Sequence, residues 1–383
     1  MADAPTNPFR FGPLALDEAF TDRESEVREL SADVRNGQDV VVFAPRRYGK
    51  SSLVWRVSQE LGTSDALVAQ VDLMRTPTKE RFAEKLAKAI HEQIATPLLR
   101  AKERLKAFSR LRLTPVVTVD PGDGSVSFSF DARAAGQDMD ATLEALLGMP
   151  GELAAARGRR VALVLDEFQA VNDIDPGLIT VMRSVFQEQP EVAHVFLGSK
   201  RHMMERIFSD ENEPFWRSAK QMELGVIAPG LFAPYAAGRF ETTGKALPDE
   251  LCARVLEITG GHPYATQELL YFLWEETQPA ATVESSTLER ALAATLRSEH
   301  AHFSLLWEGA AAAQRLVLQA LATEQPARPL SSEYQVRHSL PGTPTVQAAL
   351  DALVRAEQVR RVGRGEYLIA EPFLAEWIDL YET

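Results

Sequence analysis

Cysteine is nearly absent from this sequence, since Cys252 is the single one among 383 residues. One thiol cannot close a disulfide within the chain or supply a cysteine-rich zinc site, so the sequence excludes both. We interpret Cys252 as a small buried apolar residue, and we expect the protein to work in a reducing compartment.

Long apolar runs are missing as well. The longest, such as 161–165, fall far short of the ~20 residues that a membrane-spanning helix needs. The first residues, MADAPTNPFRFG, place no basic residue ahead of an apolar stretch, unlike a secretory signal. These absences predict a cytoplasmic protein that does not contact a membrane.

The chain has no excess of positive charge, because its formal net charge is −13. The molecule as a whole repels phosphate, so binding to nucleic acid would require a local basic patch. The most basic segment, 100–112, carries six lysine or arginine residues and one glutamate. The apolar residues Leu98, Leu105 and Phe108 favour a solvated amphipathic helix over a polyanion-binding surface.

Patterns typical of metallohydrolases and serine hydrolases are lacking. His300 and His302 are two residues apart and would point to different sides of a helix, and neither H-E-x-x-H nor G-x-S-x-G occurs. The composition, 45% apolar and 25% charged, is that of a globular protein. At this length we expect two or three domains.

Continuous apolar runs of strand length are present, and each is typical of a strand that is buried on both faces. They span 39–45, 67–73, 161–166, 192–198 and 222–227. Helical patterns separate them, and this alternation predicts an α/β fold with a parallel sheet wrapped by helices. Ahead of the first run, T-x-x-E at 21–24 predicts a capping box for the first helix.

The remaining segments predict the domain organisation. Alternating apolar and polar residues at 115–130 predict a β-hairpin, inserted in the core at about 98–135. Helical patterns dominate after 229, and the last segment has the helix, helix and hairpin order of a winged-helix domain. We predict a core at 1–228, a helical lid at 229–322 and a winged helix at 323–383.

A phosphate-binding loop follows the first predicted strand, because 44–52 reads APRRYGKSS and leads into an apolar helix. Backbone amides at the helix start would surround the β-phosphate, Lys50 would reach the β- and γ-phosphates, and Ser51 would bind Mg²⁺. Ala44 replaces the usual first glycine, which is tolerable if its φ is negative. The predicted nucleotide contacts in this loop are Ala44, Pro45, Arg46, Arg47, Tyr48, Gly49, Lys50, Ser51 and Ser52.

An acidic pair ends the third predicted strand, in VALVLDEFQ. Asp166 at the carboxyl end of a buried strand can hold the Mg²⁺ shell, while Glu167 can polarise the attacking water. A strand that ends in Asp-Glu is common and is mostly structural when it stands alone. Downstream of a phosphate-binding loop, the pair predicts ATP hydrolysis with Glu167 as a catalytic residue.

Two polar residues follow the fourth predicted strand, in VAHVFLGSKRHMM. Ligands of open α/β sheets bind beyond the carboxyl ends of the strands, so Ser199 and Arg201 are expected at the same edge as the acidic pair. A hydroxyl and a guanidinium placed there can sense a γ-phosphate. A solvated arginine without a role is the alternative for Arg201.

The chain resembles the archaeal-type ATPases of the AAA+/STAND group of P-loop NTPases. The motifs that carry the resemblance are, in order, NPFRFG, FTDRESEVREL, APRRYGKSSL, VLDEFQ, LGSKRHMM and GGHPYATQ, followed by the winged helix. The resemblance implies a five-stranded core and a helical lid. It also implies that Phe20 and Arg23 lie near the adenine, that Arg201 meets the γ-phosphate, and that Pro263 lies near the base.

These residues predict an ATP-binding, Mg²⁺-dependent ATPase that acts as a nucleotide-controlled conformational switch and has a protein partner. One alternative is a nucleic-acid-binding protein similar to origin-recognition initiators, and another is a nucleotide-binding scaffold without turnover. DNA is the less favoured partner. The presumed recognition helix offers only Arg355 against Asp351 and Glu357, although three arginines of the predicted wing could hold phosphates.

Overall fold

The computed structural model describes residues 6–12, 21, 23–99, 103, 107–120, 122, 125–130 and 136–382. These form two compact units. One is Arg23–Gly225, the sheet unit, and the other combines Met1–Asp22 with Val226–Thr383, the helical unit. Each unit has an apolar core of its own. Within the described residues, no helix combines the length and the apolar character needed to cross a bilayer.

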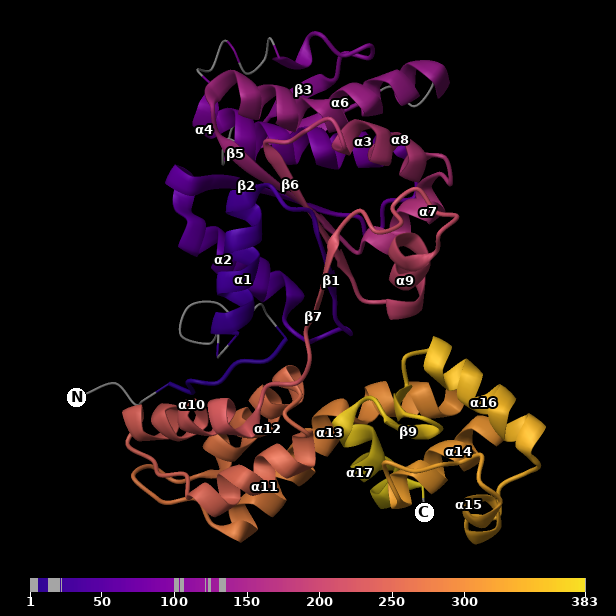
Figure 1. Cartoon of the computed structure of the whole chain (residues 1–383). Helices are drawn as coiled ribbons and strands as arrows, with labels where there is room; N and C mark the ends of the chain where they lie inside the picture. The colour runs from indigo at the N-terminus through magenta and orange to yellow at the C-terminus, as the bar shows by residue number, and fades with distance from the viewer. Residues whose placement is uncertain are drawn as a thin grey trace. The chain divides into compact units, whose positions relative to one another are not determined.

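The sheet unit is built on five parallel strands in the order β2-β5-β6-β1-β7 (Figure 1). Their bounds are β1 Val40–Phe43, β2 Ala66–Asp72, β5 Arg160–Asp166, β6 Val192–Gly198 and β7 Lys220–Glu223. Every residue of β1 and β6 is buried, as continuous apolar runs predict for central strands. The α/β class with a parallel sheet is confirmed.

Helices cover both faces of this sheet. The chain moves in one direction along the sheet from β1 to β2 and in the other from β2 through β5 to β6, and right-handed crossovers in opposite directions place their helices on opposite faces. The two on one face, which pack together, are α1 Glu24–Asn36 and α2 Lys50–Asp65. The other face carries α3 Lys79–Ala89, α6 Gly136–Arg157, α8 Leu178–Phe186 and α9 Arg201–Ser209. Shorter helical segments are η2 Ile90–Ala95, α4 Thr96–Leu98, η3 Phe168–Ala170 and α7 Val171–Ile174.

The start of α1 differs from the prediction. Val27, Leu30 and Val34 are buried as their spacing predicts, but the residue before the helix is Arg23, in a left-handed conformation with φ 72°. No side-chain capping bond forms at this end among the described residues, so the capping box at 21–24 was wrong. The Arg23 guanidinium binds Glu26 of the first turn instead.

The predicted hairpin is confirmed as an antiparallel pair, β3 Val116–Val119 and β4 Val126–Ser129. Phe128 of β4 anchors it, with its ring 5.0 Å from that of Phe108 and 5.5 Å from that of His91. Parts of the basic segment 100–112 lie outside the described residues, so its interpretation as an amphipathic helix stays a prediction.

The helical unit begins with α10 Pro229–Thr242, α11 Asp249–Thr259, α12 Pro263–Glu276 and α13 Ser285–Gly309. A winged helix follows, as predicted, with α14 Ala312–Thr323, α15 Ser332–Arg337, α16 Thr343–Arg355, β8 Val359–Gly363, β9 Glu366–Ile369 and α17 Pro372–Tyr381. Cys252 is buried in the core of this unit, and burial raises the pKa of its thiol to about 11. The thiol therefore stays protonated at neutral pH.

The described N-terminal residues 6–12 belong to the helical unit. Phe9 is fully buried, with its ring 5.4 Å from that of Phe240, and the Asn7 amide donates to the Tyr271 carbonyl at 3.1 Å. The division into domains at 1–228, 229–322 and 323–383 remains a proposal. Any test of it must account for an N-terminal segment that packs with the helices after Val226.

Candidate nucleotide-binding site

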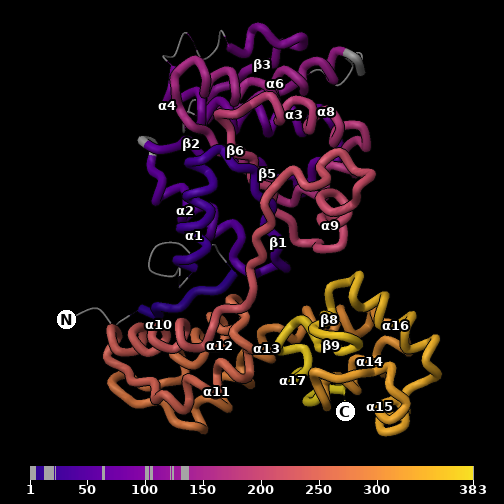
Figure 2. Tube along the Cα trace, viewed as in Figure 1, coloured from indigo at the N-terminus to yellow at the C-terminus, as the bar shows by residue number. Residues whose placement is uncertain are grey.

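Strand order brings the predicted site residues to one edge of the sheet. β6 lies between β1 and β5, so the three carboxyl ends are neighbours (Figure 2). The loop 44–52 follows β1, Asp166 is the last residue of β5 and is followed by Glu167, and Ser199 follows β6. This edge is where ligands of open α/β sheets bind.

The loop 44–52 connects β1 to α2 through two left-handed residues, Arg47 with φ 65° and Gly49 with φ 85°. Ala44 is buried, donates its amide to the Gly198 carbonyl at 3.3 Å, and has no positive φ, so alanine is accommodated there. Pro45 and Arg46 are exposed, whereas Tyr48 and Ser52 are buried. The loop therefore ends at the amino terminus of α2, where backbone dipoles favour an anion.

Lys50 folds back over its own loop. Its ammonium lies 2.9 Å from the carbonyl oxygen of Ala44 and 3.2 Å from that of Pro45, and its side chain is buried. Both acceptors are neutral carbonyls, so an anionic phosphate oxygen would be the stronger partner for this cation. Phosphate binding by Lys50 stays a prediction that this position favours.

The Asp166 carboxylate accepts three hydrogen bonds from described residues. The Ser51 hydroxyl and the Gln70 amide each donate to its Oδ2 at 3.2 Å, and the Glu167 backbone amide donates to Oδ1 at 3.0 Å. Burial raises the pKa of Asp166, and the neighbouring charge of Glu167 raises it further, while Lys50 and Ser51 oppose this shift. A bound cation would favour the ionised carboxylate at this position.

The oxygens of Ser51 and Asp166 suit a magnesium ion, because Mg²⁺ prefers hard oxygen ligands and often uses one or two from the protein. The described residues contain no group of three or more His, Cys, Asp or Glu side chains that could enclose a metal. The remaining ligands would have to be phosphate oxygens and water. This donor set fits an ion that arrives with a nucleotide.

Glu167 has a left-handed backbone, with φ 53°. The Ser199 hydroxyl donates to its Oε2 at 2.7 Å, and the Gln169 amide nitrogen donates to the same oxygen. Ser199 and Gln169 are both buried. The structure therefore joins Glu167 and Ser199, which the sequence predicted at one edge, and adds Gln169 to them.

Arg201 is the first residue of α9, and its ion-pair partners, Glu205 and Glu223, are outside the cluster of Glu167, Ser199 and Gln169. Its guanidinium binds Glu205 at 2.7 Å and Glu223 at 2.6 Å, and its side chain is 60% exposed. The hydrogen bond to Glu205 is the main reason that its pKa is raised. Glu223 ends β7, beside β1, so Arg201 is held near the sheet edge, and its role as a γ-phosphate sensor stays a prediction.

Arg23 is a buried arginine that donates hydrogen bonds to backbone carbonyls. Its guanidinium donates to the Gly225 carbonyl at 2.7 Å and to the Tyr48 carbonyl of the phosphate loop at 3.3 Å. These bonds tie the loop to the end of the sheet unit. Contact with adenine remains a prediction for Arg23, and Phe20 lies outside the described residues.

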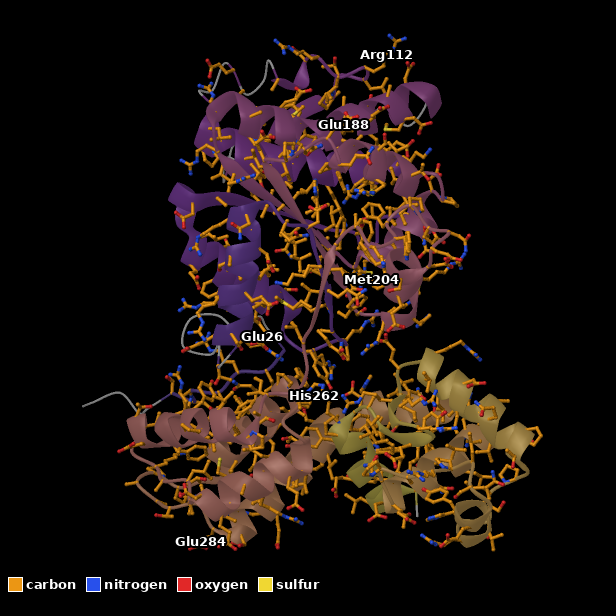
Figure 3. The ribbon with its side chains drawn as sticks, in the orientation of Figure 1. Glu26, Arg112, Glu188, Met204, His262 and Glu284 are labelled. Atoms are coloured by element: carbon orange, nitrogen blue, oxygen red, sulfur yellow. The ribbon has the colours of Figure 1, made fainter. Side chains whose placement is uncertain are left out.

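Pro263 is the first residue of α12 in the helical unit. The preceding His262, labelled in Figure 3, caps this helix by accepting the Ala265 amide at Nδ1. Gly261 has φ 69°, and its carbonyl accepts the Ile227 amide at 3.0 Å. The G-x-P motif thus fixes the start of α12, while the proximity of Pro263 to a base stays a prediction.

Two site residues escaped the sequence analysis, Gln70 and Gln169. Gln70 is a polar residue inside an otherwise apolar strand pattern, which is a signal that it has a partner. Gln169 follows the acidic pair by two residues, but no spacing rule points to it. Its contact with Glu167 depends on the tight turn η3.

Models of two known protein families match this chain. The model of a family described as an ATPase domain predominantly from Archaea matches residues 20–269. This chain belongs to that family. A second model, described as a probable winged helix domain, matches residues 301–380 and confirms the predicted C-terminal fold.

Solved structures show the same fold at low identity. A Walker-type ATPase of Pyrococcus abyssi is 15% identical with a TM-score of 0.68, covering 97% of this chain and 99% of that one. The ORC2 protein of Aeropyrum pernix, in ADPNP-ADP complexes, is 15% identical with a TM-score of 0.52 and coverages of 94% and 93%. A search of curated proteins found no match.

Proposed function

We propose that this ATPase-family chain is a Mg²⁺-dependent ATP hydrolase that acts as a nucleotide-controlled conformational switch. The observation that carries the proposal is the meeting of the phosphate loop with the acidic pair. Ser51 and Asp166 lie 115 positions apart in sequence, yet their side-chain oxygens are 3.2 Å apart. A hydroxyl and a carboxylate brought together at the start of α2 are suited to a cation that accompanies phosphates.

Each residue of the site has a definite task in this proposal. The loop amides and Lys50 bind the phosphates, and Ser52 belongs to the first turn of α2. Ser51 and Asp166 would hold Mg²⁺, which neutralises phosphate charge when bound. Glu167 takes a proton from the attacking water, and Ser199 orients the Glu167 carboxylate through the bond at 2.7 Å.

The switch rests on how the phosphate loop is tied into the sheet unit. Arg23 binds Tyr48 in the loop and Gly225, the residue at which the chain leaves this unit. A change in the conformation of the loop on nucleotide binding would therefore be transmitted to Arg23 and Gly225, the two residues at which the chain passes between the sheet unit and the helical unit. Units with separate cores are expected to move relative to one another, so these two points are where we place the hinge.

Hydrolysis is tested by Glu167→Gln, which keeps the shape of the side chain and removes its basicity. We expect this variant to bind ATP as the wild type does, while turnover of labelled ATP falls by ~10²-fold or more. Glu188→Gln is the matched control, because Glu188 is exposed and lies in the turn that follows α8 (Figure 3). Equal turnover in wild type and Glu167→Gln would contradict the role of Glu167.

The same assay distinguishes an ATP hydrolase from the alternative, a nucleotide-binding scaffold without turnover. A scaffold would bind ATP with no release of phosphate from the wild-type chain, with or without added Mg²⁺. Removal of Mg²⁺ with a chelator should abolish turnover if the proposal is correct. Turnover that persists under the chelator would contradict the role given to Ser51 and Asp166.

A further inference from the structure

Gln169 places a buried amide directly beside the acidic pair. Its Nε2 donates to Oε2 of Glu167 and lies 3.5 Å from the Ser199 hydroxyl, which donates to the same oxygen. Gln169 is 5% exposed and Ser199 is 3% exposed, so water competes poorly for these bonds. One carboxylate oxygen of Glu167 is thus held by two side chains from different elements.

The orientation of the Gln169 amide indicates that it acts as a hydrogen-bond donor to Glu167. Its Oε1 is buried and has no hydrogen-bond partner among the described residues. Leaving a buried carbonyl oxygen unpaired is unfavourable, so the bond to Glu167 must outweigh this loss. The reversed amide would turn Oε1 toward Oε2 of Glu167, which already accepts the Ser199 hydroxyl, and two acceptor oxygens would then face each other. The contact with Glu167 therefore fixes the amide as a donor.

The backbone around Gln169 is held rigid by its neighbours. Phe168 is fully buried, with its ring 4.6 Å from that of Phe196, and it also packs against Phe208 and Phe215. The Ala170 amide donates to the Glu167 carbonyl at 2.9 Å and closes the turn η3. The position of Gln169 is therefore set by the aromatic core before any nucleotide binds.

We propose that Gln169 is a positioning residue that, together with Ser199, fixes the Glu167 carboxylate for the hydrolytic step. This rests on the proposed function. With Oε2 held, Oε1 of Glu167 accepts a proton from water. The water oxygen bonds to the γ-phosphorus, the bond from that phosphorus to the bridging oxygen breaks, and ADP leaves with the electron pair. Gln169 exchanges no proton and touches no nucleotide in this scheme.

The test is Gln169→Met, which keeps the length of the side chain and removes the donor. We expect kcat for ATP hydrolysis to fall ~10-fold because the base is no longer fixed, while KM and ATP affinity change less than ~2-fold. Gln169→Glu, of nearly identical shape, should also lose turnover. It serves as the second variant if Gln169→Met fails to fold.

The matched control is Gln189→Met. Gln189 is also a buried glutamine, its Nε2 donates to the Leu147 carbonyl at 2.8 Å, and its Oε1 lacks a partner within the described residues. Because the Gln189 amide binds the Leu147 carbonyl and forms no hydrogen bond to Glu167 in the part of the chain that the structure describes, its variant should lose stability without losing kcat. Equal losses of kcat in the two variants would overturn the positioning role and indicate a general effect of buried amides.

A double-mutant cycle shows whether Gln169 acts through Glu167. In the Glu167→Gln background, Gln169→Met should lower turnover by less than ~2-fold, because the group that it positions is gone. Full additivity, or faster turnover in Gln169→Met, would overturn this inference. If Glu167→Gln slows turnover and Gln169→Met does not, the inference fails and the proposed function stands. If Glu167→Gln turns over normally, the proposed function itself fails.

Discussion

At the residue scale, the balance of charge at the sheet edge depends on Lys50. Burial and the adjacent Glu167 both raise the pKa of Asp166, and Lys50 is the nearby cation that opposes them. The same ammonium is held by two neutral carbonyls, those of Ala44 and Pro45. An anionic phosphate oxygen would bind this ammonium more strongly than a neutral carbonyl does.

Lys50→Ala should therefore remove ATP binding. Loss of a buried cation from a charged pair costs several kcal/mol, so we expect affinity for labelled ATP to fall ~10²-fold or more. Lys220→Ala is the control, because Lys220 is ion-paired with Glu29 and Asp33 at the amino end of β7. Wild-type ATP affinity in Lys50→Ala would remove the phosphate-loop assignment.

At the scale of the elements, some features were predictable from the sequence and others were not. The central strands were predicted because each is a continuous apolar run, and the loop 44–52 because its motif sits between a strand and a helix. The order β2-β5-β6-β1-β7 could not be derived, since any buried parallel strand can neighbour another. The partners of Gln70 and Gln169 depend on that order and on the turn η3, which explains why both were missed.

The start of α1 shows a different limit. T-x-x-E at 21–24 satisfies the local rule for a capping box. In the structure, however, the buried guanidinium of Arg23 donates hydrogen bonds to the carbonyls of Tyr48 and Gly225. These partners are distant in sequence, so a tertiary contact overrides the local preference. The pairing of Arg201 with Glu223 was not predictable either, because it requires β7 to lie beside β1.

The turn before α12 provides a prediction for an element. Gly260 and Gly261 are both left-handed, with φ 57° and 69°, but only at Gly261 would a Cβ collide with the Ile227 carbonyl. Gly260→Ala should lower the free energy of unfolding by about 1 kcal/mol. Gly261→Ala should lower it by about 3 kcal/mol, because strain and a backbone clash add. Urea unfolding of both variants measures the difference.

Equal destabilisation by the two substitutions would contradict the contact between Gly261 and Ile227. The comparison is well matched, because the two glycines are neighbours at the end of α11 and both have positive φ. A larger effect at Gly261 would show that the segment entering α10 is fixed by this turn. That segment carries the chain from β7 into the helical unit.

At the scale of the whole molecule, the C-terminal helix α17 packs against α13 of the helical unit. Trp377 of α17 is buried and donates its indole N–H to His300 of α13 at 3.0 Å, with Phe303 and Trp307 of the same helix nearby. The apolar C-terminal helix is thus part of the core of the helical unit. Outside this core, α15, α16 and the wing present an exposed surface that includes Val336, Val354 and Val362.

We predict that this surface is not a sequence-specific DNA reader. Residues 331–383 carry five basic and eight acidic side chains. Among the basic residues, Arg360, Arg361 and Arg364 are exposed in and around the wing, while α16 offers only Arg355. DNA affinity depends strongly on cations that neutralise phosphates and release counterions, and these are few here.

The measurement is selection of the full chain against a randomised duplex pool at ~0.15 M salt, followed by sequencing of the bound fraction. We expect weak binding without an enriched sequence, and we expect it to disappear when the three exposed wing arginines are changed to glutamine. Phosphate contacts made by the wing carry no sequence information, so that variant separates nonspecific attraction from base readout. A defined motif bound with sub-micromolar affinity would contradict the prediction, because a surface with this charge balance can reach such affinity only through direct contacts with bases.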